Sequence, residues 1–158
     1  MLAERLKLVL PESIHYDPRG CVPGRYIGEN IRLIDDLLFD IENQNDNPVV
    51  SMLDQKKAFD RVEWDWLFST QEKCNFGLTF INWLKTLYKD AKSSIVTNGI
   101  QSEYFEISRG IRQGDALSAL LYTIQFEPLF EKLRTSSLIE GNTLNLKYCG
   151  NEYEVVNM

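Results

Sequence analysis

The strongest constraint on the fold is an apolar run, residues 49–53, that ends directly in the acidic side chain of Asp54. A short apolar run that follows a polar, proline-containing stretch predicts a buried strand. The end of a strand is a rigid position beside an open loop, and such positions often carry catalytic groups. Asp60 and Glu63 have the spacing of a capping box, which predicts that Asp60 caps the next helix and leaves Asp54 free for chemistry. By spacing alone, an ordinary surface position is the favoured interpretation of both carboxylates.

Periodicity along the rest of the chain predicts helices and two strand pairs. Apolar residues recur at helical spacing in segments 2–10 (ended by Pro11), 28–44, 61–73, 80–88 and 117–134. The pair Asn98-Gly99 between β-prone segments predicts a hairpin, and a second hairpin is expected around Gly150 and Asn151. Strand pairs separated by helices, without regular βαβ alternation, predict an α+β fold with an antiparallel sheet.

Composition limits the classes of function. The 158-residue chain carries a net charge of -6, which argues against a free-standing nucleic-acid binder, because neutralising phosphates usually requires a basic surface. Cys21, Cys74 and Cys149 are too far apart for a metal-ligand or disulfide pattern, so they are interpreted as reduced, mostly buried thiols of an intracellular protein. The sequence has no run of about 20 apolar residues, so no membrane span or membrane partner is expected.

Two longer segments carry a family resemblance. Residues 53–62 (LDQKKAFDRV) resemble the A motif of reverse transcriptases, in the form typical of non-LTR (LINE-type) retrotransposons, and residues 109–118 (RGIRQGDALS) resemble the B motif of the same group. Shorter matches in the family's order lie at residues 3–11, 23–31, 80–83, 87–88, 98–99 and 105. Together they cover nearly the whole chain.

The resemblance implies the fingers and a partial palm of a right-hand polymerase. The fingers are expected at about residues 1–47 and 76–108, and the palm at about 48–75 and 109–158. The central strand and the C-terminal hairpin would form an antiparallel palm sheet packed with helices. The thumb is expected to be absent from residues 1–158.

The resemblance also implies roles for the residues of the A motif. Asp54 is expected to be the catalytic carboxylate and a ligand of Mg²⁺, with the backbone carbonyl of Gln55 as a second ligand. The turn through Lys57 and Ala58 would direct backbone N–H groups at the triphosphate of the incoming dNTP. Phe59 would lie beneath the nucleotide sugar, although packing at a strand–helix junction is the simpler interpretation from spacing alone.

Residues outside the A motif complete the expected site. Gln113 and Gly114 would lie against the dNTP and the template base, because glycine lets backbone approach a ligand closely and glutamine can both donate and accept. Arg109 and Arg112 are candidate nucleic-acid phosphate contacts, and by charge alone a solvated loop explains them equally well. Arg25, on a Pro-Gly-Arg turn, is a further candidate for a nucleic-acid contact. The three tryptophans, Trp64, Trp66 and Trp83, are better explained as core residues than as base-stacking platforms.

The sequence departs from the family pattern in ways that bear on activity. The aromatic-x-Asp-Asp motif, with two more metal carboxylates, does not occur in residues 1–158 and would be expected directly after Met158. Ala116 and Ala119 stand where prolines are usual, and Cys21 replaces a usual aromatic residue. One carboxylate cannot hold two ions about 3.5–4 Å apart, so this chain by itself is expected not to polymerise.

The expected parent activity is RNA-directed DNA polymerisation, in which dNTPs are added to a DNA 3′-end by two-metal nucleotidyl transfer. The implied partners are an RNA template, a DNA primer, dNTP and the remaining parts of a parent polyprotein: an upstream segment, the Asp-Asp motif and the thumb. The resemblance implies a nuclear location. One alternative is a non-catalytic fragment that serves as a nucleic-acid or protein interaction module. Another is an unrelated metal-dependent phosphotransferase that uses Asp54 and Asp60.

Overall fold

The structure is a computed structural model that describes residues 2–43, 51–138, 144–148 and 151–155. Its helices are α1 (Leu2–Ser13), α2 (Gly28–Asn43), the 3-10 turn η1 (Phe59–Arg61), α3 (Trp64–Lys73), α4 (Leu78–Tyr88) and α5 (Ser118–Arg134). The strands are β1 (Lys92–Ser93), β2 (Val96–Thr97), β3 (Ile100–Gln101), β4 (Phe105–Glu106), β5 (Leu144–Tyr148) and β6 (Asn151–Val155).

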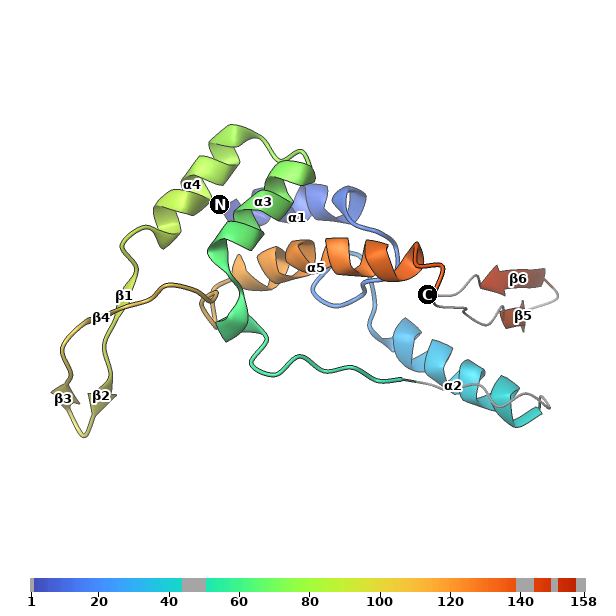
Figure 1. Cartoon of the computed structure of the whole chain (residues 1–158). Helices are drawn as coiled ribbons and strands as arrows, with labels where there is room; N and C mark the ends of the chain where they lie inside the picture. Colours follow the sequence, from blue (N-terminus) through green and yellow to red (C-terminus); the bar gives the residue numbers. More distant parts are fainter. Residues whose placement is uncertain (1, 44–50, 139–143, 149–150, 156–158) are drawn as a thin grey trace.

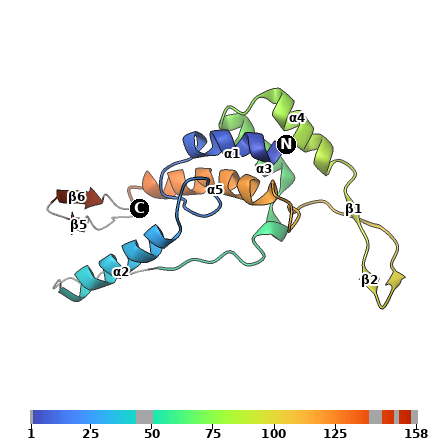
Figure 2. The same cartoon turned by 180° about the vertical axis from the view of Figure 1, so that it is seen from behind.

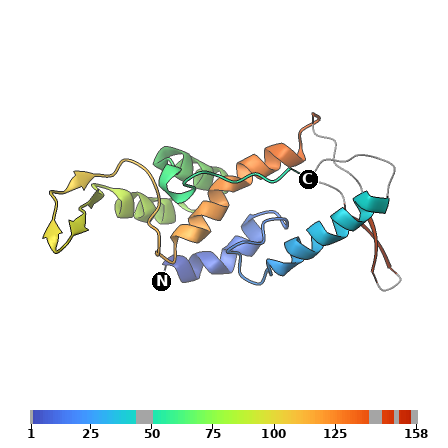
Figure 3. The ribbon, with the colours of Figure 1, turned by 90° about the horizontal axis from the view of Figure 1, so that it is seen from below.

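Helix α5 lies at the centre of the molecule. Helices α1 and α3 pack against it and α4 packs against α3 (Figures 1 and 2). The fully buried apolar side chains come from all four of these helices, namely Leu6, Leu10, Leu67, Ile81, Leu84, Leu121 and Ile124. Helix α2 and the pair β5–β6 lie at one end of the molecule, and the arm formed by β1 to β4 projects from the other (Figure 3). The core therefore holds α5 and the start of α3, the two elements beside the predicted site, in fixed positions.

Asp115 fixes the start of α5. Its Oδ1 accepts a 3.1 Å hydrogen bond from the N–H of Leu117, and its carbonyl accepts one of 3.1 Å from Ser118. A carboxylate at this end also complements the positive end of the helix dipole, and Lys132 and Arg134 complement the negative end. The predicted helix over residues 117–134 is confirmed, with its first residue moved by one.

The first helix runs further than predicted. Pro11 was expected to end it, but α1 continues through Pro11 to Ser13, whose hydroxyl donates to the carbonyl of Val9 at 2.8 Å. A proline in a helix costs one backbone hydrogen bond and a steric clash. Burial of Leu10 and Ile14 on either side of it offsets that cost.

The predicted central strand is wrong in the part that can be checked. Residues 51–55 have no regular structure, and Leu53 is 88% exposed. Val49 and Val50 lie outside the described residues. An apolar run forms a strand only where a neighbouring strand accepts its backbone hydrogen bonds, and none of the described strands pairs with this segment. The predicted palm sheet through this segment is therefore not formed in the described part of the chain.

The predicted capping role of Asp60 is also wrong. Asp60 lies inside η1, and α3 begins at Trp64, with Glu63 in the N-cap position and no side-chain cap. Val62 separates the two helical segments in an extended conformation. It does so because its side chain is buried and its carbonyl accepts a hydrogen bond from Gly110.

Both predicted hairpins are confirmed. The β2–β3 pair turns at Asn98 and Gly99, whose φ angles of 51° and 81° are the left-handed values that a tight type I′ turn requires. Strands β5 and β6 pair antiparallel with Leu144 opposite Val155. With β1–β4, the described strands form three two-stranded antiparallel sheets, and together with the helices they confirm the α+β class.

Several predictions about burial are corrected. Trp66 and Trp83 are 48% and 44% exposed, so only Trp64 has a substantial part of its ring within the core. Cys21 is exposed rather than buried, Cys74 is partly buried, and Cys149 lies outside the described residues. Among the helices that the structure describes, none has the length and apolarity needed to cross a membrane.

Candidate functional site

The segments predicted as the A and B motifs cross each other at Gly110. The N–H of Gly110 donates to the carbonyl of Val62 at 2.7 Å, and the N–H of Ile111 donates to the carbonyl of Phe59 at 2.9 Å. The indole N–H of Trp64 donates to the carbonyl of Gly110 at 2.8 Å. These three bonds hold together two segments that are distant in the sequence.

Glycine is required at this crossing. The φ angle of Gly110 is 91°, a left-handed value that other residues adopt only with strain. A Cβ added there would lie 3.3 Å from both the Cα and the carbonyl oxygen of Asp60. The close approach of the two backbones therefore depends on the missing side chain.

Several of the predicted phosphate and base contacts surround one small pocket beside the crossing. It measures about 250 Å³, and Arg109, Arg112, Gln113 and Asp60 contribute to its lining. The Gln113 amide donates to Oδ1 of Asp60 at 3.4 Å, a long bond. Arg109 pairs with Glu63 at 3.4 Å, and both side chains are more than half exposed.

Tyr88 and Trp64 form the apolar wall of the same pocket, with their rings 5.3 Å apart. Burial, and then the Asp115 carboxylate, raise the pKa of Tyr88, while Arg112 acts in the opposite direction. Arg112 and Asp115 therefore lie within electrostatic range of Tyr88. Gly114 lies further along the loop with φ 87° and open space around its Cα.

Asp54 lies in a second, larger cavity of about 850 Å³ between residues 53–59 and helix α5. Its walls are mostly apolar and aromatic, including Phe59, Tyr122 and Phe126. The Phe59 ring meets Tyr122 edge-on at 5.0 Å. Phe59 thus packs against α5, as the simpler interpretation predicted, and it also lines the cavity that contains Asp54.

Tyr122 connects α5 to the Asp54 segment. Its hydroxyl donates a 2.6 Å hydrogen bond to Oε1 of Gln55. Burial, and then the neighbouring Asp54 carboxylate, raise the pKa of Tyr122. Gln55 therefore turns its side chain toward α5, although both Gln55 and Asp54 stay exposed.

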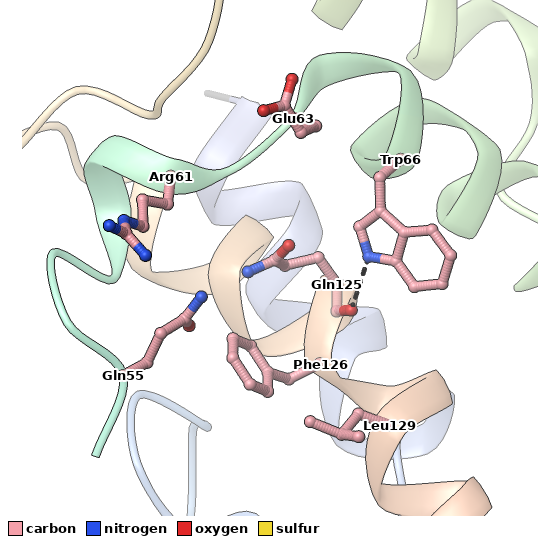
Figure 4. Close-up of a pocket in the computed structure, with 7 residues that line it drawn as sticks. All are labelled: Gln55, Arg61, Glu63, Trp66, Gln125, Phe126 and Leu129. Carbon is pink, nitrogen blue, oxygen red and sulfur yellow. Dashed lines mark hydrogen bonds between the residues drawn. The ribbon is translucent and has the colours of Figure 1, made fainter.

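Gln55 also reaches a third pocket of about 270 Å³, where it faces Arg61 and Gln125 (Figure 4). Trp66 closes one side and donates its indole N–H to the backbone carbonyl of Gln125 at 3.2 Å. This pocket adjoins the predicted site and was not expected from the sequence.

Lys57 and Ala58 form the turn that leads into η1. Lys57 has a left-handed φ of 54°, and its carbonyl accepts a 3.2 Å hydrogen bond from the N–H of Arg61. Its side chain is exposed. The predicted role of this turn in binding a triphosphate stays a prediction.

Arg25 has a structural use that the sequence did not reveal. Its guanidinium donates to the carbonyls of Pro11 and Pro18 at 3.0 and 2.8 Å. Further bonds reach the carbonyls of His15, Tyr16 and Ile14. The side chain thus holds the loop between α1 and α2 together, and its predicted contact with nucleic acid stays a prediction.

The donor set for a divalent metal is incomplete in the described part of the chain. No group of three or more Asp, Glu, His or Cys side chains comes together there as a metal site. Asp54 is an exposed carboxylate at the mouth of its cavity, and Asp60 is occupied with Gln113. These residues do not by themselves fit a two-ion centre.

The sequence did not single out Gly110 or Tyr122 as site residues, and it assigned Trp64 only to the core. The signals available were weak: a glycine within a basic loop, an aromatic residue within an apolar helix, and a tryptophan at a helix start. Each acts through a partner far away in the sequence, namely Trp64 with Gly110 and Tyr122 with Gln55.

Comparison with known proteins gives a consistent result. The family described as reverse transcriptase (RNA-dependent DNA polymerase) matches residues 1–149. A Xenopus laevis protein, the transposon TX1 uncharacterized 149 kDa protein, is 41% identical over 130 residues, which cover 82% of this chain and 10% of that protein.

Two further relatives are retrovirus-related Pol polyproteins. That of the type-2 retrotransposable element R2DM of Drosophila melanogaster is 28% identical, over 84% of this chain and 12% of the polyprotein. That of the type-1 retrotransposable element R2 of Nasonia vitripennis is 25% identical, over 73% of this chain and 11% of the polyprotein. The chain thus spans about a tenth of the length of these relatives.

Proposed function

This chain belongs to the reverse transcriptase (RNA-dependent DNA polymerase) family, and on that premise we propose that it forms the nucleotide-binding part of a non-LTR retrotransposon polymerase. The parent activity is the addition of dNTPs to a DNA 3′-end along an RNA template. RNA template, DNA primer, dNTP and further parts of a parent polyprotein are the partners of this activity. A nuclear location follows from the same proposal.

The crossing at Gly110 is the observation that carries the proposal. It brings the turn at residues 57–60 and the loop at residues 109–114 to the same place. Arg109 and Arg112 at this place supply positive charge for phosphate groups, and Gln113 can both donate to and accept from a base.

We assign the remaining residues as follows. Asp54 is the catalytic carboxylate, and the backbone N–H groups of Lys57 and Ala58 face the triphosphate. Phe59 lies below the sugar, and Gly114 leaves room for the base pair. Segments 1–47 and 76–108 correspond to fingers, and 48–75 and 109–158 to palm.

The metal chemistry requires more donor residues than the described part of the chain provides. Asp54 and the carbonyl of Gln55 are the oxygen donors that this chain offers to Mg²⁺. When bound, Mg²⁺ would neutralise phosphate charge beside them. Because the described donors do not complete a site for two ions, the purified 158-residue chain should not extend a primer.

Binding of dTTP in the presence of Mg²⁺, measured by isothermal titration calorimetry, tests the proposed site. We expect the chain to bind dTTP more tightly than dTMP, and Arg112→Gln to weaken binding of dTTP several-fold. Lys7→Gln is the matched control, since Lys7 pairs with Glu4 on the exposed face of α1, in another part of the sequence. Equal binding of dTTP by the wild type and Arg112→Gln would overturn the assignment.

A primer-extension assay tests the expected lack of activity. The wild-type chain is incubated with an RNA template, a DNA primer, dNTPs and Mg²⁺. Template-dependent extension that Asp54→Ala abolishes would show that the 158 residues suffice, contrary to the proposal.

A further inference from the structure

We propose that Trp64 is a positioning residue for the triphosphate site, and that it acts through the hydrogen bond from its indole N–H to the carbonyl of Gly110. This bond would set the orientation of the loop that carries Arg112 and Gln113. The inference rests on the function proposed above and adds a residue that acts through the backbone of the loop.

The peptide groups around Gly110 are held from both sides. The N–H of Gly110 donates to Val62, its carbonyl accepts from Trp64, and the next N–H, of Ile111, donates to Phe59. A glycine with φ 91° has several accessible backbone conformations, so the peptide bond after it can rotate unless both ends are fixed. Among the described residues, the Trp64 indole is the side chain that hydrogen-bonds to the carbonyl end of this group.

The indole is itself rigidly placed. Trp64 is the first residue of α3, and its ring lies 5.3 Å from that of Tyr88, the last residue of α4. A partly buried indole N–H normally finds an acceptor, and here the acceptor is the loop carbonyl. The ends of two core helices therefore determine where Gly110 lies.

The loop beyond Gly110 has one anchored residue and two exposed ones. Ile111 is buried, whereas Arg112 and Gln113 are exposed on the pocket that Trp64 and Tyr88 also line. A change in the Gly110 peptide would therefore rotate Arg112 and Gln113 relative to Asp60. In this way the Trp64 indole on the wall of the pocket controls the position of the exposed side chains that also line it.

Trp64→Phe tests the inference, because it keeps an aromatic ring beside Tyr88 and removes the N–H. Trp66→Phe is a matched control: it removes the same kind of indole-to-carbonyl bond, to Gln125, away from the Gly110 loop. Both variants are compared with the wild-type chain in dTTP titrations with Mg²⁺. Amide hydrogen exchange at Gly110 and Ile111 is measured in parallel without nucleotide.

We expect Trp64→Phe to accelerate exchange at Gly110 and Ile111 and to weaken dTTP binding about three- to tenfold, as loss of one hydrogen bond predicts. Trp66→Phe should leave both measurements within about twofold of wild type. Faster exchange in Trp64→Phe together with unchanged dTTP affinity would overturn the positioning role. Unchanged exchange would overturn it as well.

A wild-type chain that does not bind dTTP would contradict the proposed function, whereas the exchange measurement still decides whether Trp64 fixes the loop. If Trp64→Phe does not fold, Gly110→Ala disturbs the same crossing from the other segment, because its new Cβ would lie 3.3 Å from the Asp60 backbone. Gly99→Ala, with a similar φ of 81° and open space around it on the projecting arm, is its control. Equal dTTP affinities for these two variants would contradict the inference.

Discussion

The hydroxyl of Tyr122 donates a 2.6 Å hydrogen bond to the side-chain oxygen of Gln55. This bond ties the central helix α5 to residues 51–58, an exposed segment without a regular element before η1. Such a segment depends on individual tertiary contacts for its position. The bond therefore places Asp54, the residue next to Gln55, at the mouth of the large cavity.

Tyr122→Phe should loosen the Asp54 segment. The variant keeps the ring against Phe59 and removes only the hydroxyl, so the free energy of unfolding should fall by about 1 kcal/mol or less. Limited trypsin digestion should cut faster after Lys56 and Lys57. Tyr104→Phe, a change at an exposed ring on the projecting arm, is the control and should leave the digestion pattern unchanged. Identical cleavage rates in all three proteins would contradict the role of this bond.

Asp54→Asn should lower the pKa of Tyr122. Burial and the Asp54 carboxylate both raise that pKa above its ordinary value of 10.0, so removing the charge should leave only the effect of burial. The raised pKa stabilises the folded state below about pH 10, and this stability is lost as the pH rises through the folded-state pKa. Ultraviolet titration of tyrosinate, with Tyr122→Phe to identify the signal, measures the shift. An upward shift in Asp54→Asn would contradict the assigned contact.

Arg134→Gln should destabilise the chain more than loss of a surface ion pair does. The Arg134 guanidinium lies 2.6 Å from Glu127 and 3.4 Å from Asp17, and all three side chains are mostly buried. Removing the arginine leaves the buried Glu127 carboxylate without its ion-pair partner and Asp17 with only His15, so the free energy of unfolding should fall by about 2–4 kcal/mol. Urea denaturation measures the change, and Lys7→Gln on the exposed face of α1 is the control. Similar midpoints for the two variants would contradict the importance of this network.

Arg25→Lys should open the loop between α1 and α2. A lysine ammonium has three donors and cannot reproduce the planar fork that reaches five carbonyls, so the free energy of unfolding should fall by about 1–2 kcal/mol. Arg109→Lys, at a pair more than half exposed, should change it by at most about 0.5 kcal/mol. Hydrogen exchange over residues 14–27 reports the opening. Protection equal to that of wild type would show that Arg25 does not hold the loop.

The helices and turns were predictable because their signals are local. The apolar composition of α5, the Asn98-Gly99 turn and the C-terminal hairpin each depend on residues close together in the sequence. The A- and B-motif resemblance also lies within two short segments, and the family match over residues 1–149 confirms it. Their local character explains why these predictions agree with the structure.

The predictions that failed depended on distant partners. The apolar run before Asp54 could form a strand only with a neighbouring strand to pair with, and the described part of the chain provides none. Asp60 has the spacing of a helix cap. The hydrogen bond from Gly110 to Val62, however, holds the backbone extended, so the helix begins only at Trp64. The spacing of neighbouring residues contains no information about a hydrogen bond to a loop near residue 110.

The sequence by itself determined the family, the α+β class and the identity of the candidate residues around Asp54 and Gln113, because motifs and periodicity are properties of neighbouring residues. Only the tertiary structure decided how those residues meet. The Trp64–Gly110 and Tyr122–Gln55 hydrogen bonds join segments that the chain brings together by packing α3, α4 and α5 around one core. Hydrogen bonds between distant segments form only after burial of that core has fixed both partners in place.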